Sequence, residues 1–92
     1  MLFRSNDAWM AWQFDRPEQG RGVVQAFRRA ESIYEVARFK LRGLEPDARY
    51  RVTTLGTANT STELSGGEMM QAGLRVEAPA APTAVVMGYE RL

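Results

Sequence analysis

The sequence predicts an all-β protein: a small antiparallel β-sandwich of about seven to eight strands, Greek-key-like, with one short helical turn near residues 66–72. Polar and apolar residues alternate with a period of two in several short stretches, as expected for strands with one buried face. Turn-forming residues separate these stretches at intervals typical of an all-β sandwich or barrel. Leu44, Pro46 and Tyr50 form a Leu-x-Pro-x-x-x-Tyr pattern, the spacing of a corner where a chain crosses between two sheets.

The first two predicted strands form a hairpin. Residues 8–15 alternate, residues 15–20 form a polar turn containing proline and glycine, and residues 22–29 resume the alternation. In residues 8–15, one face carries Met10, Trp12 and Phe14, and the other carries Trp9, Ala11 and Gln13. We expect the face with Trp12 to point into the core and the face with Trp9 to point outward.

The next strand shows the clearest alternation in the chain. It spans residues 35–42 and follows a predicted loop at residues 30–34. One face carries three basic residues, and the other carries Ala37, Phe39 and Leu41. A helix would scatter these apolar residues around its axis, so we predict a strand with one buried and one solvated face.

The proline corner connects this strand to the next one. We expect Tyr50 to be buried there, with its hydroxyl hydrogen-bonded to nearby backbone. Residues 49–55 alternate again, and residues 56–59 form the turn that follows. Residues 60–64 are short, polar and rich in β-branched side chains, which predicts an edge strand.

A short helix is expected after the edge strand. Ser65 and Glu68 fit a capping box at its start, and Gly73 can adopt the left-handed conformation that ends it. Residues 74–78 then form a short strand, residues 79–82 a stiff proline-containing link, and residues 83–90 the final strand. The final strand gathers three large side chains on one face: Val85, Met87 and Tyr89.

The 92 residues provide enough chain for one domain with a modest core. We expect residues 1–7 to be an N-terminal lead-in at a boundary within a longer protein, and residues 8–92 to be a single domain. The 12 basic and 11 acidic residues alternate along the chain, so we expect no nucleic-acid partner. No apolar run is long enough for a membrane span, and no signal-peptide pattern is present, so we expect a cytoplasmic location and no membrane partner.

The sequence contains no cysteine and no histidine. The most common metal ligands and the most common general base are therefore missing, and we expect neither a metal nor another cofactor. Asp15 and Glu18 come nearest to the pair of carboxyl groups that glycoside hydrolysis requires. They flank Arg16 and Pro17 in a predicted turn, which favours solvated carboxylates over a catalytic pair.

Three groups of residues occur in a recognisable order. They are Trp9, Met10 and Trp12; the corner from Leu41 to Val52; and the segment from Ser65 to Leu74. Together they resemble the C-terminal domain of bacterial α-galactosidases of glycoside hydrolase family thirty-six, from about Ala8 to the end of the chain. The resemblance implies a small β-sandwich that follows a (β/α)-barrel holding two catalytic aspartates, in enzymes that release terminal α-linked galactose with retention.

None of that catalytic machinery maps onto this sequence. The resemblance therefore implies a noncatalytic domain that packs on the catalytic barrel of its parent enzyme and stabilises it. We expect such a domain to expose an apolar patch, which would promote self-association of the isolated chain.

Two alternatives remain open. Trp9 and Trp12 are three residues apart and lie on opposite faces of a strand, so one ring is available to contact a sugar or a neighbouring domain, and Trp9 is the candidate. The other alternative is a fibronectin type III-like interaction module, which also uses the Leu-x-Pro-x-x-x-Tyr pattern. The predicted helix between residues 65 and 74 is foreign to that fold.

Overall fold

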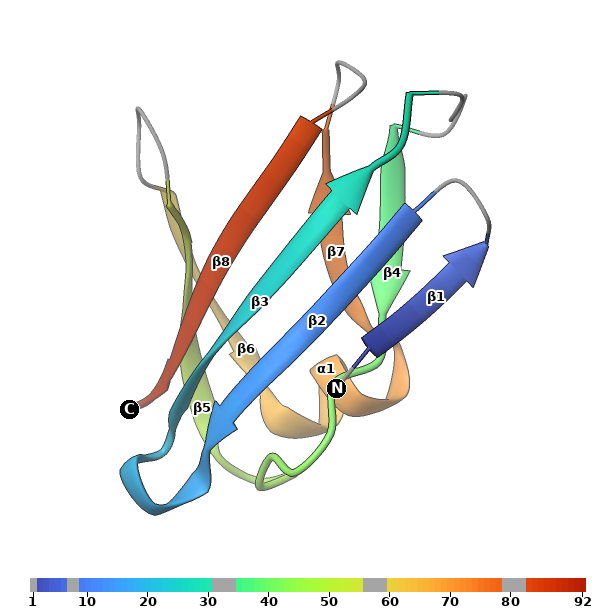
Figure 1. Cartoon of the computed structure of the whole chain (residues 1–92). Helices are drawn as coiled ribbons and strands as arrows, with labels where there is room; N and C mark the ends of the chain where they lie inside the picture. The colour runs from blue at the N-terminus through green and yellow to red at the C-terminus, as the bar shows by residue number, and fades with distance from the viewer. Residues whose placement is uncertain (1, 7–8, 31–34, 56–59, 79–82) are drawn as a thin grey trace.

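The computed structural model describes residues 2–6, 9–30, 35–55, 60–78 and 83–92 of the chain (Figure 1). These residues form two antiparallel β-sheets, one short α-helix and one turn of 3₁₀-helix. In chain order the elements are β1 (Leu2–Asn6), β2 (Trp9–Arg16), the 3₁₀ turn η1 (Pro17–Gln19), β3 (Arg21–Arg28), β4 (Val36–Phe39), β5 (Arg49–Leu55), β6 (Thr60–Ser65), α1 (Gly66–Gln71), β7 (Leu74–Glu77) and β8 (Thr83–Arg91).

The two sheets form the predicted sandwich. The larger sheet has six strands in the order β1-β2-β3-β8-β5-β6, and the smaller sheet pairs β4 with β7. Figure 1 shows β4 and β7 behind β2 and β3, with α1 at the lower end of the molecule. The hairpin of β2 and β3 and the position of β6 at a sheet edge are as predicted. No helix in the described part of the chain is long and apolar enough to cross a membrane.

Two elements differ from the prediction. Residues 2–6, expected to be part of a lead-in, form β1 and pair with β2. The strand expected at residues 35–42 ends at Phe39, because the backbone N–H of Leu41 donates to the carbonyl of Met69 in α1 rather than to a strand. The loop expected at residues 30–34 falls mostly outside the described residues, and the turn at 56–59 and the link at 79–82 fall entirely outside them.

The core lies between the two sheets. Its buried apolar side chains come from both sheets, the corner and α1: Trp9, Ala11, Val24, Ala26, Ala37, Phe39, Leu41, Leu44, Tyr50, Val52, Met69, Leu74, Val76, Ala78, Met87 and Tyr89. The alternation in residues 37–41 therefore predicted their buried face correctly, and in β8 Met87 and Tyr89, which share a face, are also buried. Arg28 is also buried, and its Nη1 donates a 2.6 Å hydrogen bond to the carbonyl of Ala78 just beyond β7.

The corner and α1 form one hydrogen-bonded unit. Tyr50 is 3% exposed, and its hydroxyl accepts a 3.0 Å hydrogen bond from the backbone N–H of Glu45. The N–H groups of Gly66 and Gly67, at the start of α1, donate to the carbonyls of Ala48 and Pro46. The corner therefore satisfies helix N–H groups that have no partner within the helix.

Both ends of α1 carry the expected capping residues. The Ser65 side chain accepts from the backbone N–H of Glu68, and the Glu68 side chain accepts from the backbone N–H of Ser65. Gly73 follows the helix with a positive φ of 95°, a conformation that favours glycine. These local bonds fix the direction in which the chain enters β7.

Candidate functional site

The orientation of β2 is the reverse of the one predicted. Trp9 is fully buried, and its ring lies 6.1 Å from that of Phe39, so it is not the outward-facing ring. Trp12 lies on the opposite face and is partly exposed, while Phe14 is 55% exposed. The prediction was wrong because the two-residue period shows which side chains share a face, but not which face is buried.

The polar residue on the buried face of β2 is fully hydrogen-bonded. Gln13 donates from Nε2 to the carbonyl of Arg42 at 2.9 Å and to the hydroxyl of Tyr89 at 2.8 Å. Its Oε1 accepts from the backbone N–H of Arg42 at 3.0 Å. Because the amide is satisfied in this way, Gln13 can lie in the core beside Trp9 and Ala11.

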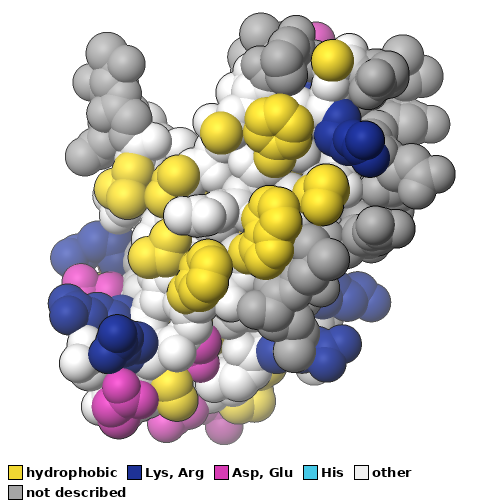
Figure 2. Space-filling view, in the orientation of Figure 1, with side chains coloured by type: hydrophobic (Ala, Val, Ile, Leu, Met, Phe, Trp, Pro, Cys, Tyr) yellow, Lys and Arg dark blue, Asp and Glu magenta, His cyan; other side chains and the backbone are white. Residues whose placement is uncertain are grey.

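Because Trp9, Ala11 and Gln13 face the core, the opposite side of the larger sheet carries an apolar surface. We call this surface the outer face, and the strand register assigns to it Met10, Trp12, Phe14, Val23, Gln25, Phe27, Thr53, Leu55, Ala84, Val86 and Gly88. Figure 2 shows hydrophobic side chains gathered over the middle of this side of the molecule, in the region of β2, β3 and β8. Phe14, Leu55 and Phe27 are exposed by 55%, 47% and 39%.

A charged row borders the outer face at one end. The register places five charged side chains next to one another across five strands: Arg16, Arg21, Glu90, Arg51 and Glu63. No ion pair joins two members of this row in the described part of the chain, and Glu63 instead pairs with Arg49 at 3.7 Å. The outer face thus combines an apolar centre with a charged border, as protein interfaces do.

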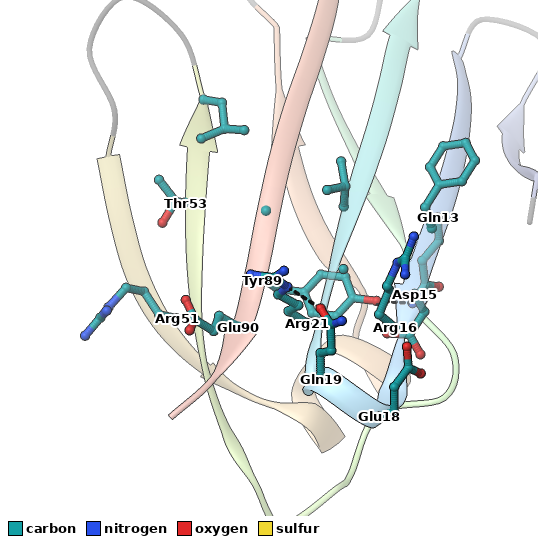
Figure 3. Close-up of a pocket in the computed structure, with 15 residues that line it drawn as sticks. Gln13, Asp15, Arg16, Glu18, Gln19, Arg21, Arg51, Thr53, Tyr89 and Glu90 are labelled. Atoms are coloured by element: carbon teal, nitrogen blue, oxygen red, sulfur yellow. Dashed lines mark hydrogen bonds between the residues drawn. The ribbon is translucent and has the colours of Figure 1, made fainter.

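An open groove of about 1210 Å³ runs across the outer face where it meets the charged row (Figure 3). Gly88 lies in the groove, with Val23 and Thr53 as its cross-strand neighbours. Phe14 and Leu55 contribute further apolar lining. Figure 3 shows Arg51 and Glu90 on one side of the groove and Arg16 and Glu18 on the other.

A polar cluster lies beneath one end of this groove. The hydroxyl of Tyr89 donates a 2.6 Å hydrogen bond to Asp15 Oδ1 while it accepts from Gln13. Burial, followed by the hydrogen bond to Asp15, raises the pKa of Tyr89 well above its usual value. The hydroxyl therefore stays protonated and acts as a donor to Asp15.

This cluster accounts for one of the two candidate carboxylates. Asp15 accepts a hydrogen bond from a buried tyrosine, and Glu18 lies in the exposed η1 turn. Within the described residues, no group of three or more His, Cys, Asp or Glu side chains is arranged to hold a metal ion. The geometry thus makes Asp15 a structural hydrogen-bond acceptor.

Residues 9–87 match the family model described as the glycosyl hydrolase family 36 C-terminal domain. The chain belongs to this family. The match covers the corner, α1, β2, β3, β5 and the first five residues of β8. It argues against the fibronectin type III alternative, whose fold does not account for α1.

Solved structures provide a second comparison for this family 36 C-terminal domain. It is similar to the galactosidase domain of alpha-galactosidase-sucrose kinase, AgaSK, with a TM-score of 0.72 and 27% identity over 95% of the present chain. It also resembles the alpha-galactosidase from Lactobacillus brevis, with a TM-score of 0.70 and 18% identity over 92% of the chain. The chain spans 12% of the length of each. A search of curated proteins found no significant match.

The sequence analysis expected an exposed apolar patch but did not place it on the outer face, although one signal for that position was present. Residues 8–15 carry large apolar side chains on both faces, which is typical of a strand that is covered on both sides. In the described part of the chain, the Trp9 face of β2 is buried. The apolar residues of the other face are half-buried or exposed and form the candidate site.

Proposed function

We propose that this domain is the noncatalytic closing domain of a retaining α-galactosidase, and that it packs its outer face on the catalytic barrel of the same polypeptide and stabilises that barrel. We refer to this longer polypeptide as the parent enzyme. The observation that carries the proposal is the outer face itself, an apolar sheet surface with a charged border. The family match and the α-galactosidase titles of the similar structures support the nature of the parent.

The energetics favour docking within one polypeptide. Burying a large apolar side chain contributes roughly 1.5–3 kcal/mol, and Phe14, Phe27 and Leu55 all have exposed area left to bury. Association of separate molecules would first lose translational and rotational freedom. Covalent linkage makes this loss smaller, because the barrel is held at a high effective concentration.

The test is to place Phe14→Ser and Phe27→Ser, singly, in the parent enzyme and follow thermal inactivation of aryl α-galactoside hydrolysis. Both variants should inactivate faster than the unmodified enzyme, because each removes an apolar contact with the barrel. Val36→Ser is the matched control, since Val36 is 38% exposed but lies in β4 of the other sheet. Equal inactivation rates for all four proteins would contradict the proposal.

The noncatalytic role has a separate test. The isolated 92-residue chain should not turn over an aryl α-galactoside, because its nearest candidate acid, Asp15, is held by Tyr89 in a structural hydrogen bond. Turnover by the isolated chain that disappears in Asp15→Asn would contradict this role.

Sugar binding is a second candidate function, and one observation favours it. The outer face carries three partly exposed aromatic rings, those of Trp12, Phe14 and Phe27. Trp12 replaces Trp9 as the candidate for a stacking ring, because Trp9 is buried. A saturable change in tryptophan fluorescence on addition of galactose, melibiose or raffinose, lost in Trp12→Ala, would support this function, and a flat response would count against it.

A further inference from the structure

Two glycines lie in neighbouring central strands of the larger sheet. Gly22 is in β3 and Gly88 is in β8, and neither has a positive φ, so neither position requires glycine for its backbone conformation. Glycine inside a strand weakens the strand and often marks a close approach of another group. The absence of a side chain at each position must therefore be explained by the groups that surround it.

The reason for Gly22 lies within the chain. It faces the core directly opposite Tyr89, and a side chain at position 22 would collide with the Tyr89 hydroxyl. The missing side chain thus makes room for the ring that reaches Asp15. The chain itself fills the space left by Gly22.

The described part of the chain does not fill the space left by Gly88. This space opens on the outer face, and among the described residues the nearest atom to a side-chain carbon added there would be the carbonyl oxygen of Gly22, 4.0 Å away. Val23 and Thr53 flank it across the two adjacent ladders. Gly88 therefore forms part of the floor of the groove, with Phe14 and Leu55 contributing apolar lining farther out.

We infer that Gly88 is the floor of a socket that receives one apolar side chain from the catalytic domain of the parent enzyme. This inference rests on the proposed function and names the contact point within it. The apolar lining of Phe14, Val23 and Leu55 matches an aliphatic or aromatic side chain. The occupant belongs to the same polypeptide, because this domain spans 12% of the similar structures, both titled as α-galactosidases.

The charged side chains at the border of the socket indicate which kind of group of the catalytic domain lies beside the docked apolar side chain. Three arginines and three carboxylates line the groove: Arg16, Arg21, Arg51, Asp15, Glu18 and Glu90. Asp15 already accepts a hydrogen bond from Tyr89. None of these three arginines forms an ion pair within the described part of the chain. The docked segment of the catalytic domain therefore presents a carboxylate next to its apolar side chain.

The first experiment fills the socket. Gly88→Ala and Gly88→Leu are placed both in the isolated chain and in the parent enzyme. The isolated chain should keep or gain stability against urea, because the added side chain meets open space and glycine is a poor strand former. The parent enzyme should lose activity faster on heating, and Gly88→Leu should have the larger effect.

The controls separate this inference from the proposed function. Ala72→Leu, which enlarges an exposed side chain after α1, should leave both proteins unchanged. If Phe14→Ser and Phe27→Ser weaken the parent but Gly88→Leu does not, the socket is wrong and docking through the outer face stands. If none of the three variants weakens the parent, the proposed function fails as well.

Other outcomes would overturn the socket in different ways. A loss of stability in the isolated Gly88→Leu chain would show that the space is not open. If that variant abolishes self-association of the isolated chain and leaves the parent unchanged, a second copy occupies the groove. A saturable sugar response that is lost in Gly88→Leu would make the groove a sugar site.

A charge reversal tests the predicted carboxylate. Arg16→Glu should accelerate thermal inactivation of the parent enzyme without lowering the stability of the isolated chain against urea, because position 16 faces Arg21 across the ladder between β2 and β3. Arg38→Glu is the matched control, because Arg38 is an exposed arginine of β4 in the other sheet. Equal inactivation of these two variants would contradict a carboxylate beside the socket.

Discussion

The hydroxyl of Tyr89 in β8 donates a 2.6 Å hydrogen bond to Asp15 in β2, although β3 lies between these two strands. Gly22 in β3 leaves the space that the Tyr89 hydroxyl occupies. Gln13 donates to the same hydroxyl and also bonds the backbone of Arg42. The cluster thus connects two non-adjacent strands of the large sheet to the segment that enters the corner.

Replacing Tyr89 with Phe should lower the free energy of unfolding by roughly 1–3 kcal/mol. The substitution removes the donor to half-buried Asp15 and one of the two acceptors that the buried amide nitrogen of Gln13 uses. Urea unfolding of the isolated chain measures the effect. Ser61→Ala, which removes an exposed hydroxyl contact with Thr53, is the control and should stay within about 0.5 kcal/mol. Equal effects would show that burial of the cluster does not matter.

The stability contributed by Tyr89 should depend on pH in the alkaline range. Its pKa in the folded chain is raised above the usual value of 10.0, so the folded state keeps the proton that the unfolded state releases. This contribution is fully present below about pH 10 and is lost as the pH rises toward the raised pKa. The stability difference between the wild-type chain and Tyr89→Phe should therefore shrink above about pH 10. A constant difference in urea unfolding across that range would refute the shift.

Replacing Tyr50 with Phe should destabilise the chain by roughly 1 kcal/mol or more. The hydroxyl is the acceptor for the backbone N–H of Glu45, and the ring is buried beneath the corner. Chemical denaturation gives the change in free energy, and circular dichroism shows whether the sheet remains intact. If the stability does not change measurably, the corner does not contribute to holding the two sheets together.

The two tryptophans should respond differently to a soluble quencher. In Trp9→Phe the remaining indole is Trp12, which lies partly exposed on the outer face, so acrylamide should quench it efficiently. In Trp12→Phe the remaining indole is Trp9, which is fully buried and should be protected. The measurement is the Stern–Volmer slope of each folded variant. The reverse order would show that the orientation of β2 is wrong.

Much of the fold could be predicted from local patterns. The alternation of Ala37, Phe39 and Leu41 indicated their buried face because charged residues occupy the opposite positions. The corner around Tyr50 could be predicted because its hydrogen bond spans only five residues. Where one face is polar, or the bond is local, the sequence contains the necessary information.

The outer face and the polar cluster depend on information that is not local. Trp9 and Trp12 lie on two faces that are both apolar, so alternation cannot show which face meets the second sheet. Asp15 and Tyr89 are 74 residues apart, and only the order of the strands brings them together. The partner proposed to cover the outer face also lies outside these 92 residues. A face that is covered by another domain carries the same apolar pattern as a core face, so the sequence alone did not distinguish the two.

Chemical labelling at position 25 tests the central claim most directly, because Gln25 is an exposed polar residue of the outer face between Trp12 and Val86. The chain has no cysteine of its own, so Gln25→Cys creates a unique thiol in the isolated chain. We expect a maleimide to label this thiol rapidly in the isolated chain and much more slowly in the parent enzyme, as followed by peptide mass spectrometry. Arg38→Cys, on the other sheet, should react equally in both proteins. Equal labelling of position 25 in the two proteins would contradict docking through the outer face.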